Sequence, residues 1–215
     1  MRLPLVTLLL ALLAVGAFRA MRPSADAGPT TIAASVDGVR FTFATAYARD
    51  GATRMGGALE RLAFLTVFPD FAPAPAASAE PERRNAQAFD PTHVFIAIAP
   101  RDETIDPAER PSHLYARFLE SEVWAAPGGL MLRRFEAGSP YELEQLYLAP
   151  PDGALFFARC PKREAGFMGA APCLWALRRG ALDVEVRFSP SLLEHWSRIV
   201  EGTQDFLRRI EAAPR

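Results

Sequence analysis

The sequence predicts an α+β fold, mostly an antiparallel sheet of about eight or nine short strands, with one middle helix and a C-terminal helix packed on the sheet. Strand-like segments follow one another along the chain with turn signals between them, and the last segment is strongly amphipathic. Consecutive strands followed by a covering helix are typical of α+β domains. The chain has 215 residues, half of them apolar, which is enough for one domain with a substantial core.

An apolar segment opens the chain. Residues 3–18 carry no charge, Arg2 precedes them, and Arg19 and Arg22 follow them. A positive start before a short leucine-rich stretch is typical of an export signal. The sequence therefore predicts a signal-anchor or signal peptide over 1–22, an N-terminal apolar helix that is separate from the folded domain.

The position of the small-residue motif ADA at residues 25–27 decides between cleavage and retention. It lies well beyond the apolar run, with two arginines between. The sequence therefore favours a retained anchor that holds the lipid bilayer through residues 3–18, with a cleaved signal peptide as the alternative. We expect 23–30 to be a tether and 31–215 a single exported domain. This predicts a bacterial envelope protein, anchored in the cytoplasmic membrane with its body in the periplasm, or free in the periplasm if cleaved.

The first strands are indicated by a hairpin signal. TIAASV and VRFTFAT flank Asp37-Gly38, a pair that tolerates the positive φ angles of a two-residue turn. Residues 61–68 are apolar on both alternating faces and predict a central strand covered on both sides. The proline-rich residues 69–84 predict a long surface loop or a flexible flap. Residues 92–100 alternate and predict another strand.

The middle of the chain predicts one helix. Asp106 followed by Pro107 and Glu109 is typical of a helix start, which Pro111 could delay by one turn. Apolar residues then recur at helical spacing, namely Leu114, Tyr115, Phe118 and Leu119. The next strand candidates are GLMLRRFE, EQLYLAP, ALFFARC, CLWALRR and ALDVEVRF. Because short turns separate them, they predict an antiparallel meander.

The C-terminal segment predicts an amphipathic helix. Ser189-Pro190 introduces it, and Ser191 with Glu194 has the spacing of a capping box. One apolar stripe runs along it, formed by Leu192, Trp196, Ile199, Thr203, Phe206 and Ile210. A helix with one such stripe buries it against another layer, so we expect it to pack on the sheet.

The chain has two cysteines, Cys160 and Cys173, each at the end of a predicted strand. In an oxidising exported compartment such a pair predicts a disulfide. The spacing is too wide for a CxxC redox motif. We therefore expect a structural disulfide that closes the loop between two strands.

Composition and motifs disfavour several classes of function. The formal net charge is −1, so we expect no nucleic-acid partner. GxGxxG and GxxxxGK motifs are missing from the sequence, and we expect no cofactor. His93, His113 and His195 lie in different predicted elements without metal-ligand spacing, so no metal site is assigned. The sequence has no GxSxG motif, and no catalytic residue is assigned.

Aromatic residues near the turns of the meander are the candidates for partner contact. They are Trp124, Phe135, Tyr141 and Tyr147. Aromatic side chains are enriched in protein interfaces, although the same residues can instead fill the core.

The sequence thus favours a non-catalytic envelope protein that binds another protein or serves as an accessory subunit of an envelope complex. Two alternatives stay open. One is an envelope hydrolase with dispersed catalytic residues. The other is an immunity or inhibitor protein that inserts a loop, such as 69–84 or the loop between the cysteines, into its partner.

Overall fold

The structure is a computed structural model that describes residues 30–75, 90–102, 104–162 and 171–211. The apolar segment predicted over 1–22, and all of the predicted tether except Thr30, lie outside the described residues. In the described part of the chain no helix has the length and apolar character needed to span a membrane. Residues from Thr31 onward form one compact unit.

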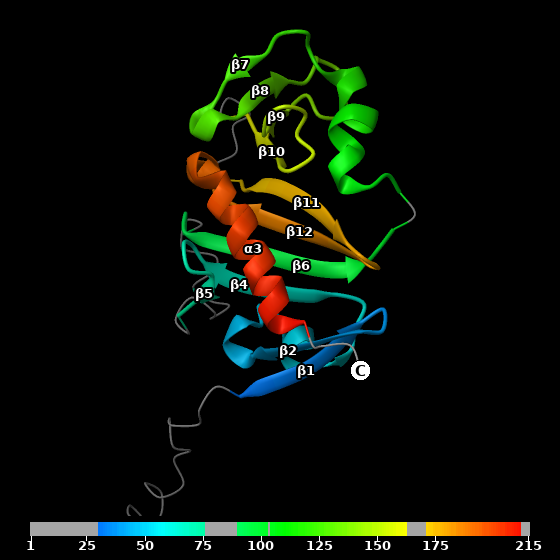
Figure 1. The fold of residues 1–215 in the computed structure, drawn as a ribbon, viewed down its shortest axis with the longest axis vertical. Helices are drawn as coiled ribbons and strands as arrows, with labels where there is room; N and C mark the ends of the chain where they lie inside the picture. Colours follow the sequence, from blue (N-terminus) through cyan, green and yellow to red (C-terminus); the bar gives the residue numbers. More distant parts are fainter. Residues whose placement is uncertain (1–29, 76–89, 103, 163–170, 212–215) are drawn as a thin grey trace, which may run out of the picture. The chain divides into compact units, whose positions relative to one another are not determined.

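The main element is an antiparallel sheet of nine strands (Figure 1). Its strands are β4 (Leu62–Val67), β5 (Ala72–Pro73), β6 (His93–Pro100), β7 (Trp124–Ala125), β8 (Met131–Arg134), β9 (Glu144–Leu148), β10 (Phe157–Pro161), β11 (Cys173–Arg179) and β12 (Leu182–Phe188). Their spatial order is β5-β4-β6-β12-β11-β10-β9-β8-β7. The predicted antiparallel meander is confirmed from β8 to β12, because each of these strands pairs with its neighbour in sequence. The short strand β7 was not predicted and adds to β8 at the edge of the sheet.

A smaller sheet holds the predicted hairpin. Strands β1 (Thr31–Val36) and β2 (Val39–Ala44) pair antiparallel, and β3 (Gly57–Ala58) adds in parallel to β1. Asp37 and Gly38 have φ angles of 47° and 77°, the left-handed conformation that this turn requires. The hairpin prediction is confirmed.

The C-terminal helix α3 (Trp196–Ile210) crosses β4, β6 and β12 on one face of the large sheet (Figure 1). It buries the predicted stripe from Ile199 to Ile210. The predicted capping box is wrong, however. A 3₁₀ turn, η8 (Pro190–His195), precedes α3, and Ser189 Oγ accepts a hydrogen bond from the Ser191 amide at 3.3 Å. The turn η8 buries both Leu192 and Leu193, and the regular helix begins at Trp196.

Phe64 of β4 contacts both the small sheet and helix α3. Its ring lies 4.9 Å from Phe43 of β2 and 5.3 Å from Phe206 of α3, both edge-to-face. Leu62 to Thr66 of β4 are all buried, so the predicted covering of this strand on both faces is confirmed. At the edge of β4 opposite β6, the Ala63 amide donates to Thr53 Oγ1 at 2.9 Å. Thr53 belongs to the short helix α2 (Gly51–Met55).

The predicted middle helix is replaced by three short turns. They are the 3₁₀ turn η3 (Pro107–Glu109), the π turn η4 (Pro111–Tyr115) and the 3₁₀ turn η5 (Ala116–Phe118). Asp106 caps the first turn as expected, because its Oδ1 accepts from the Ala108 amide at 3.0 Å. Pro111 has no amide hydrogen and its ring crowds the preceding turn, which explains why no regular α-helix passes through it. Two further 3₁₀ turns are η1 (Thr45–Tyr47) and η6 (Pro127–Gly129).

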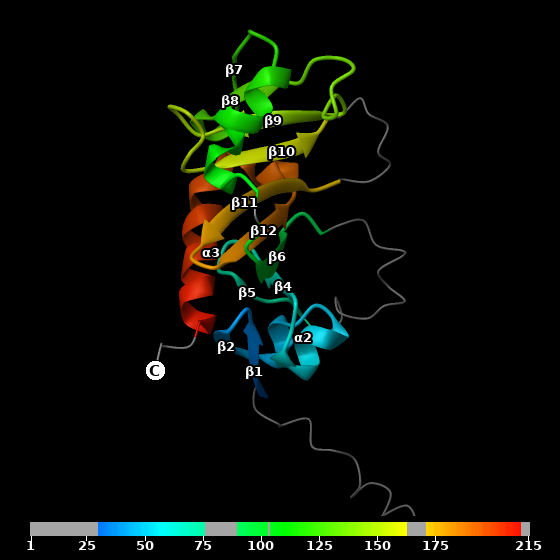
Figure 2. The ribbon, with the colours of Figure 1, turned by 90° about the vertical axis from the view of Figure 1, so that its right-hand side faces the viewer.

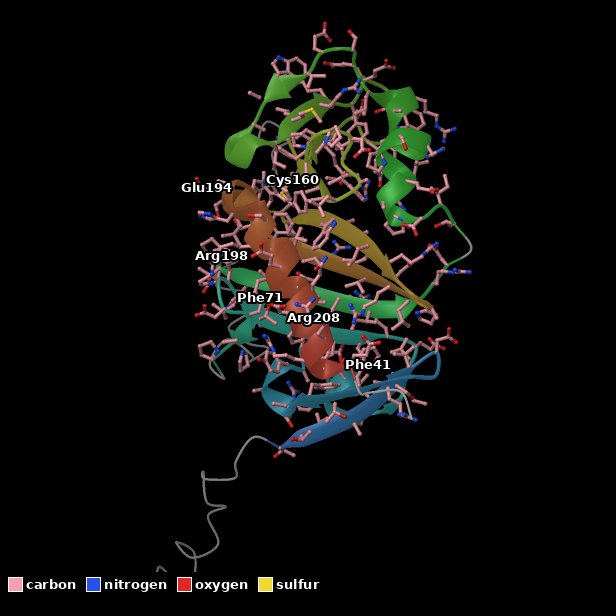
Figure 3. All side chains as sticks on the ribbon, in the orientation of Figure 1. Phe41, Phe71, Cys160, Glu194, Arg198 and Arg208 are labelled. Carbon is pink, nitrogen blue, oxygen red and sulfur yellow. A yellow bond between two sulfur atoms is a disulfide. The ribbon has the colours of Figure 1, made fainter. Side chains whose placement is uncertain are left out.

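The beginning of the predicted loop 69–84 is not a surface loop. It contains β5, and Phe71 is buried beside α3 (Figure 3). The ring of Phe71 lies against Gly202, where an added Cβ would be 2.1 Å from Phe71 Cε2. Residues 76–84 lie outside the described residues.

Replacing Gly202 with alanine should therefore destabilise the protein. Alanine normally favours a helix over glycine by about 1 kcal/mol, but overpacking a core costs roughly 1–3 kcal/mol. Because Phe71 is held by surrounding residues, we expect the clash to dominate and Tm to fall by roughly 2–4 °C per kcal/mol lost. Ser197→Ala, at an exposed position of the same helix, is the control. A Gly202→Ala variant as stable as the wild type would contradict the packing described.

Candidate functional site

Helix α3 covers only part of the large sheet. At its start, the Trp196 ring stacks on Phe156 at 5.4 Å, immediately before β10. Just after its end, Glu211 forms a bridge with Phe41 of β2. The helix therefore reaches from β10 to the small sheet. Trp196 Nε1 also donates to the Gly128 carbonyl at 2.9 Å, in the η6 turn between β7 and β8, and the strands β7, β8 and β9 themselves extend beyond the start of the helix. Figure 2 shows α3 along one side of β6, β11 and β12, with β7 to β9 above its upper end.

Strand register places two of the four candidate aromatics on the α3 side of these outer strands. Trp124 pairs with Leu132, Leu132 with Tyr147, and Tyr147 with Ala158. Ala158 lies two residues from Phe156 and so faces the same side as the α3 contact. Trp124, Leu132 and Tyr147 thus form one row across β7, β8 and β9.

A second row lies beside the first. Arg134 of β8 pairs with Gln145 of β9, which pairs with Cys160 of β10. We call the surface formed by the two rows the outer sheet patch, and define it as Trp124, Leu132, Arg134, Gln145 and Tyr147. All are partly exposed, Arg134 most of all.

The polar groups of the patch are held in place by their neighbours. The Arg134 guanidinium carbon lies 4.7 Å from the centre of the Trp124 ring, a cation–π contact. Gln145 Nε2 donates to Tyr147 Oη at 2.8 Å. The patch therefore presents an oriented arginine beside a row of apolar and aromatic side chains.

The other two candidate aromatics lie on the opposite face of the sheet. Phe135 is fully buried, so it fills the core and does not present a contact surface. It packs at 5.9 Å from Tyr115 and 5.0 Å from Tyr141, and Tyr141 is only partly exposed. Arg159 lies over Tyr115 and Tyr141 at 5.5 and 5.0 Å, with its Nη1 2.9 Å from Glu144 Oε2. This cluster packs η4 onto the outer strands.

Burial in this cluster changes the chemistry of Tyr115. Desolvation raises the pKa of its hydroxyl above the ordinary value, while the positive charge of Arg159 acts in the opposite direction. The neutral hydroxyl is therefore the form that the fold favours.

The cysteines form the predicted disulfide, with Cys160 and Cys173 both buried. It joins β10 to β11, two strands that pair at one register position, Arg159 with Leu174 (Figure 3 labels Cys160). Most of the loop between the cysteines, residues 163–170, lies outside the described residues. The bond is a covalent link between the outer strands and the strands under α3.

The histidines lie in three separate places. His93 begins β6 near Asp90, with 3.7 Å between Nε2 and Oδ2, and His195 stacks on Phe68 at 5.6 Å. His113 Nδ1 lies 3.0 Å from Ser112 Oγ, and both residues are exposed on η4. Within the described ranges, no three His, Cys, Asp or Glu residues are grouped so that they could hold a metal ion.

Comparison with known proteins gives one informative similarity. No protein-family model matches the chain, and no curated protein matches it significantly in sequence. The solved structure of Smlt3025, an immunity protein of the Stenotrophomonas maltophilia type IV secretion system, aligns with a TM-score of 0.59 and 16% identity, over 86% of this chain and 94% of that one. The two chains share a fold.

A second solved structure is more distant. It is FrpD, an iron-regulated outer membrane lipoprotein of Neisseria meningitidis, with a TM-score of 0.46 and 9% identity. The alignment covers 83% of this chain and 92% of that one. A similarity of this size supports no argument about function.

Three residues of the patch were not among the candidates from the sequence, namely Leu132, Arg134 and Gln145. The alternation in LMLRRF places Leu132 and Arg134 on one face, and EQLYL does the same for Gln145 and Tyr147. What could not be known from these segments is the register that aligns them across the strands.

Removing the disulfide should lower the free energy of unfolding. In the chain-entropy model a bond that closes a loop of this size contributes about 3 kcal/mol. We expect a loss of that order in the double variant Cys160→Ala/Cys173→Ala, measured by urea unfolding. Reductant should destabilise the wild type toward the same value and leave the double variant unchanged. Equal stability of the two proteins without reductant would be the contrary result.

The raised pKa of Tyr115 predicts a loss of stability at alkaline pH. The folded state disfavours tyrosinate, so this contribution is complete below the ordinary tyrosine pKa of about 10 and is lost as the pH rises through the raised value. Between about pH 9 and pH 11, the wild type should lose more free energy of unfolding than Tyr115→Phe. Parallel pH profiles for the two proteins would show that burial of this hydroxyl is not coupled to folding.

Proposed function

We propose that this protein is a non-catalytic, exported module of the bacterial envelope that binds another protein through the outer sheet patch. The observation that carries the proposal is the aligned, half-buried row of Trp124, Leu132 and Tyr147 on the strands that extend beyond the start of α3. Tryptophan, tyrosine and arginine are the residue types that most often dominate binding energy in protein interfaces. Trp124, Tyr147 and Arg134 supply all three within one small surface.

Within this role we favour an immunity or inhibitor protein over an accessory subunit. The support is the fold shared with the immunity protein of the Stenotrophomonas maltophilia secretion system. An inhibitor also needs a preformed surface, because a rigid surface loses less entropy on binding. Strand pairing and the Cys160–Cys173 bond hold the outer sheet patch in this way.

For the location, we propose that residues 1–22 anchor the chain in the cytoplasmic membrane, that 23–30 form a tether, and that 31–215 lie in the periplasm. The disulfide supports an oxidising compartment, since such bonds persist mainly outside the cytosol. A periplasmic protein released by cleavage of the signal is the alternative.

Capture of the full chain from its native envelope tests the binding role. After crosslinking, we expect a second protein to be recovered with the wild type and to be lost from Leu132→Asp, which places a charge in the apolar row. Met55→Asp is the matched control, because Met55 is 82% exposed in α2, away from the patch. The purified full chain should suppress the activity of the captured protein if it is an inhibitor.

Two results would count against this function. Recovery of the wild-type chain alone and in high yield would contradict a binding role. A partner retained equally by Leu132→Asp and the wild type would place the interface elsewhere.

A further inference from the structure

The charge of the outer sheet patch is unbalanced. Several buried or half-buried arginines of this protein have a carboxylate at short distance, including Arg178, 2.7 Å from Asp183, and Arg179, 2.6 Å from Glu211. Across the part of the chain that the structure describes, Arg134 has no such ion pair, and its guanidinium lies over the Trp124 ring instead. Glu122, the acidic residue closest before Trp124 in sequence, accepts from Ser121 Oγ at 3.3 Å.

The contact with Trp124 orients Arg134 without using its hydrogen-bonding groups. When a guanidinium stacks by its face on an aromatic ring, its N–H groups at the edge are still available as donors. These donors match the two oxygens of a carboxylate, which an arginine binds in a bidentate way. Arg49, Arg117 and Arg209 also lie over aromatic rings, but Arg134 is the arginine whose ring belongs to the outer sheet patch. The exposed Arg40 of β2 has no aromatic contact among the described residues.

The surroundings of Arg134 define what else a ligand must offer. Gln145 lies opposite Arg134 in the register, with its amide directed by the hydrogen bond to Tyr147 Oη. The adjoining row of Trp124, Leu132 and Tyr147 is apolar and aromatic. A complementary ligand therefore carries a carboxylate next to an apolar side chain.

We infer that the outer sheet patch binds an acidic segment of the protein partner, with an Asp or Glu of the partner paired to Arg134 and a neighbouring apolar side chain on the Trp124–Leu132–Tyr147 row. This inference rests on the proposed function and specifies its chemistry. The positive charge at Arg134 speeds association with an acidic surface, while the apolar row slows dissociation.

Site-specific crosslinking identifies the partner that the test requires. Val123, next to Trp124 and 53% exposed, is replaced in the full chain by a photo-crosslinking amino acid, and crosslinks are formed in the native envelope. The protein recovered is purified and titrated with the wild type, Arg134→Glu, Arg134→Gln and Arg40→Glu. Arg40→Glu carries the same charge change on β2, in the other sheet. Thermal unfolding of each variant verifies that it folds.

We expect Kd to rise at least tenfold for Arg134→Glu, to rise less for Arg134→Gln, and to stay within twofold for Arg40→Glu. Exchanging an Asp or Glu of the partner next to its crosslinked position for arginine should restore binding to Arg134→Glu. The increase in Kd for Arg134→Glu should also shrink at high salt, because the pairing is electrostatic.

Other outcomes would overturn the inference, and they separate it from the proposed function. If a captured partner binds Arg134→Glu and Arg134→Gln as tightly as the wild type, the binding role stands. In that case the proposed pairing of Arg134 with a carboxylate of the partner is wrong. A crosslink to a second copy of this chain, or within the chain to residues 163–170, assigns the patch a different occupant. Failure to crosslink or copurify any protein overturns both proposals.

Discussion

The fold is governed by a mismatch between the length of one helix and the width of one sheet. Helix α3 has 15 residues and so spans about 22 Å, whereas nine strands at about 4.8 Å spacing extend over roughly 38 Å. Helix α3 packs where the two sheets meet, with Phe206 against Phe64. The outer strands receive their cover from η4 instead, on the opposite face, through Tyr115. On the α3 side of β7 to β9, the side chains of Trp124, Leu132 and Tyr147 are consequently half-buried rather than fully enclosed.

Alternation along the strands then decides the role of each aromatic residue. Trp124 and Tyr147 are on one face, and Phe135 and Tyr141 contribute to the packed cluster on the other, although all four lie within a stretch of 24 residues. A shift of one residue in the register of β7 and β9 would turn Trp124 and Tyr147 toward the packed cluster. Packing of Phe135 in the core therefore also specifies which side chains the outer strands present to solvent.

The sequence predicted best what depends on near neighbours. The turn at Asp37-Gly38 and the apolar stripe of α3 are local patterns, and the disulfide needed only the export signal and a count of cysteines. The packing of Phe71 on Gly202 depends on residues far apart in the chain, and nothing in either segment indicates it. The outer sheet patch could not be predicted from the sequence for the same reason. Its rows form only when β7, β8 and β9 are aligned in register. The middle turns differed from a helix because the steric effect of Pro111 prevailed over the apolar spacing.

The disulfide also strengthens the junction between β10 and β11 against force. Antiparallel strands separate one hydrogen-bonded pair at a time when they are pulled apart at one end, and β10 and β11 share a single register position. A load that reaches β10 through its pairing with β9 is therefore carried to β11 by the Cys160–Cys173 bond as well as by this single pair. The force passes through covalent chain into β11 and β12, and from there into the core under α3. In the arrangement proposed above, with the N-terminal segment as tether and the outer sheet patch as binding surface, the disulfide lies on the path between the two.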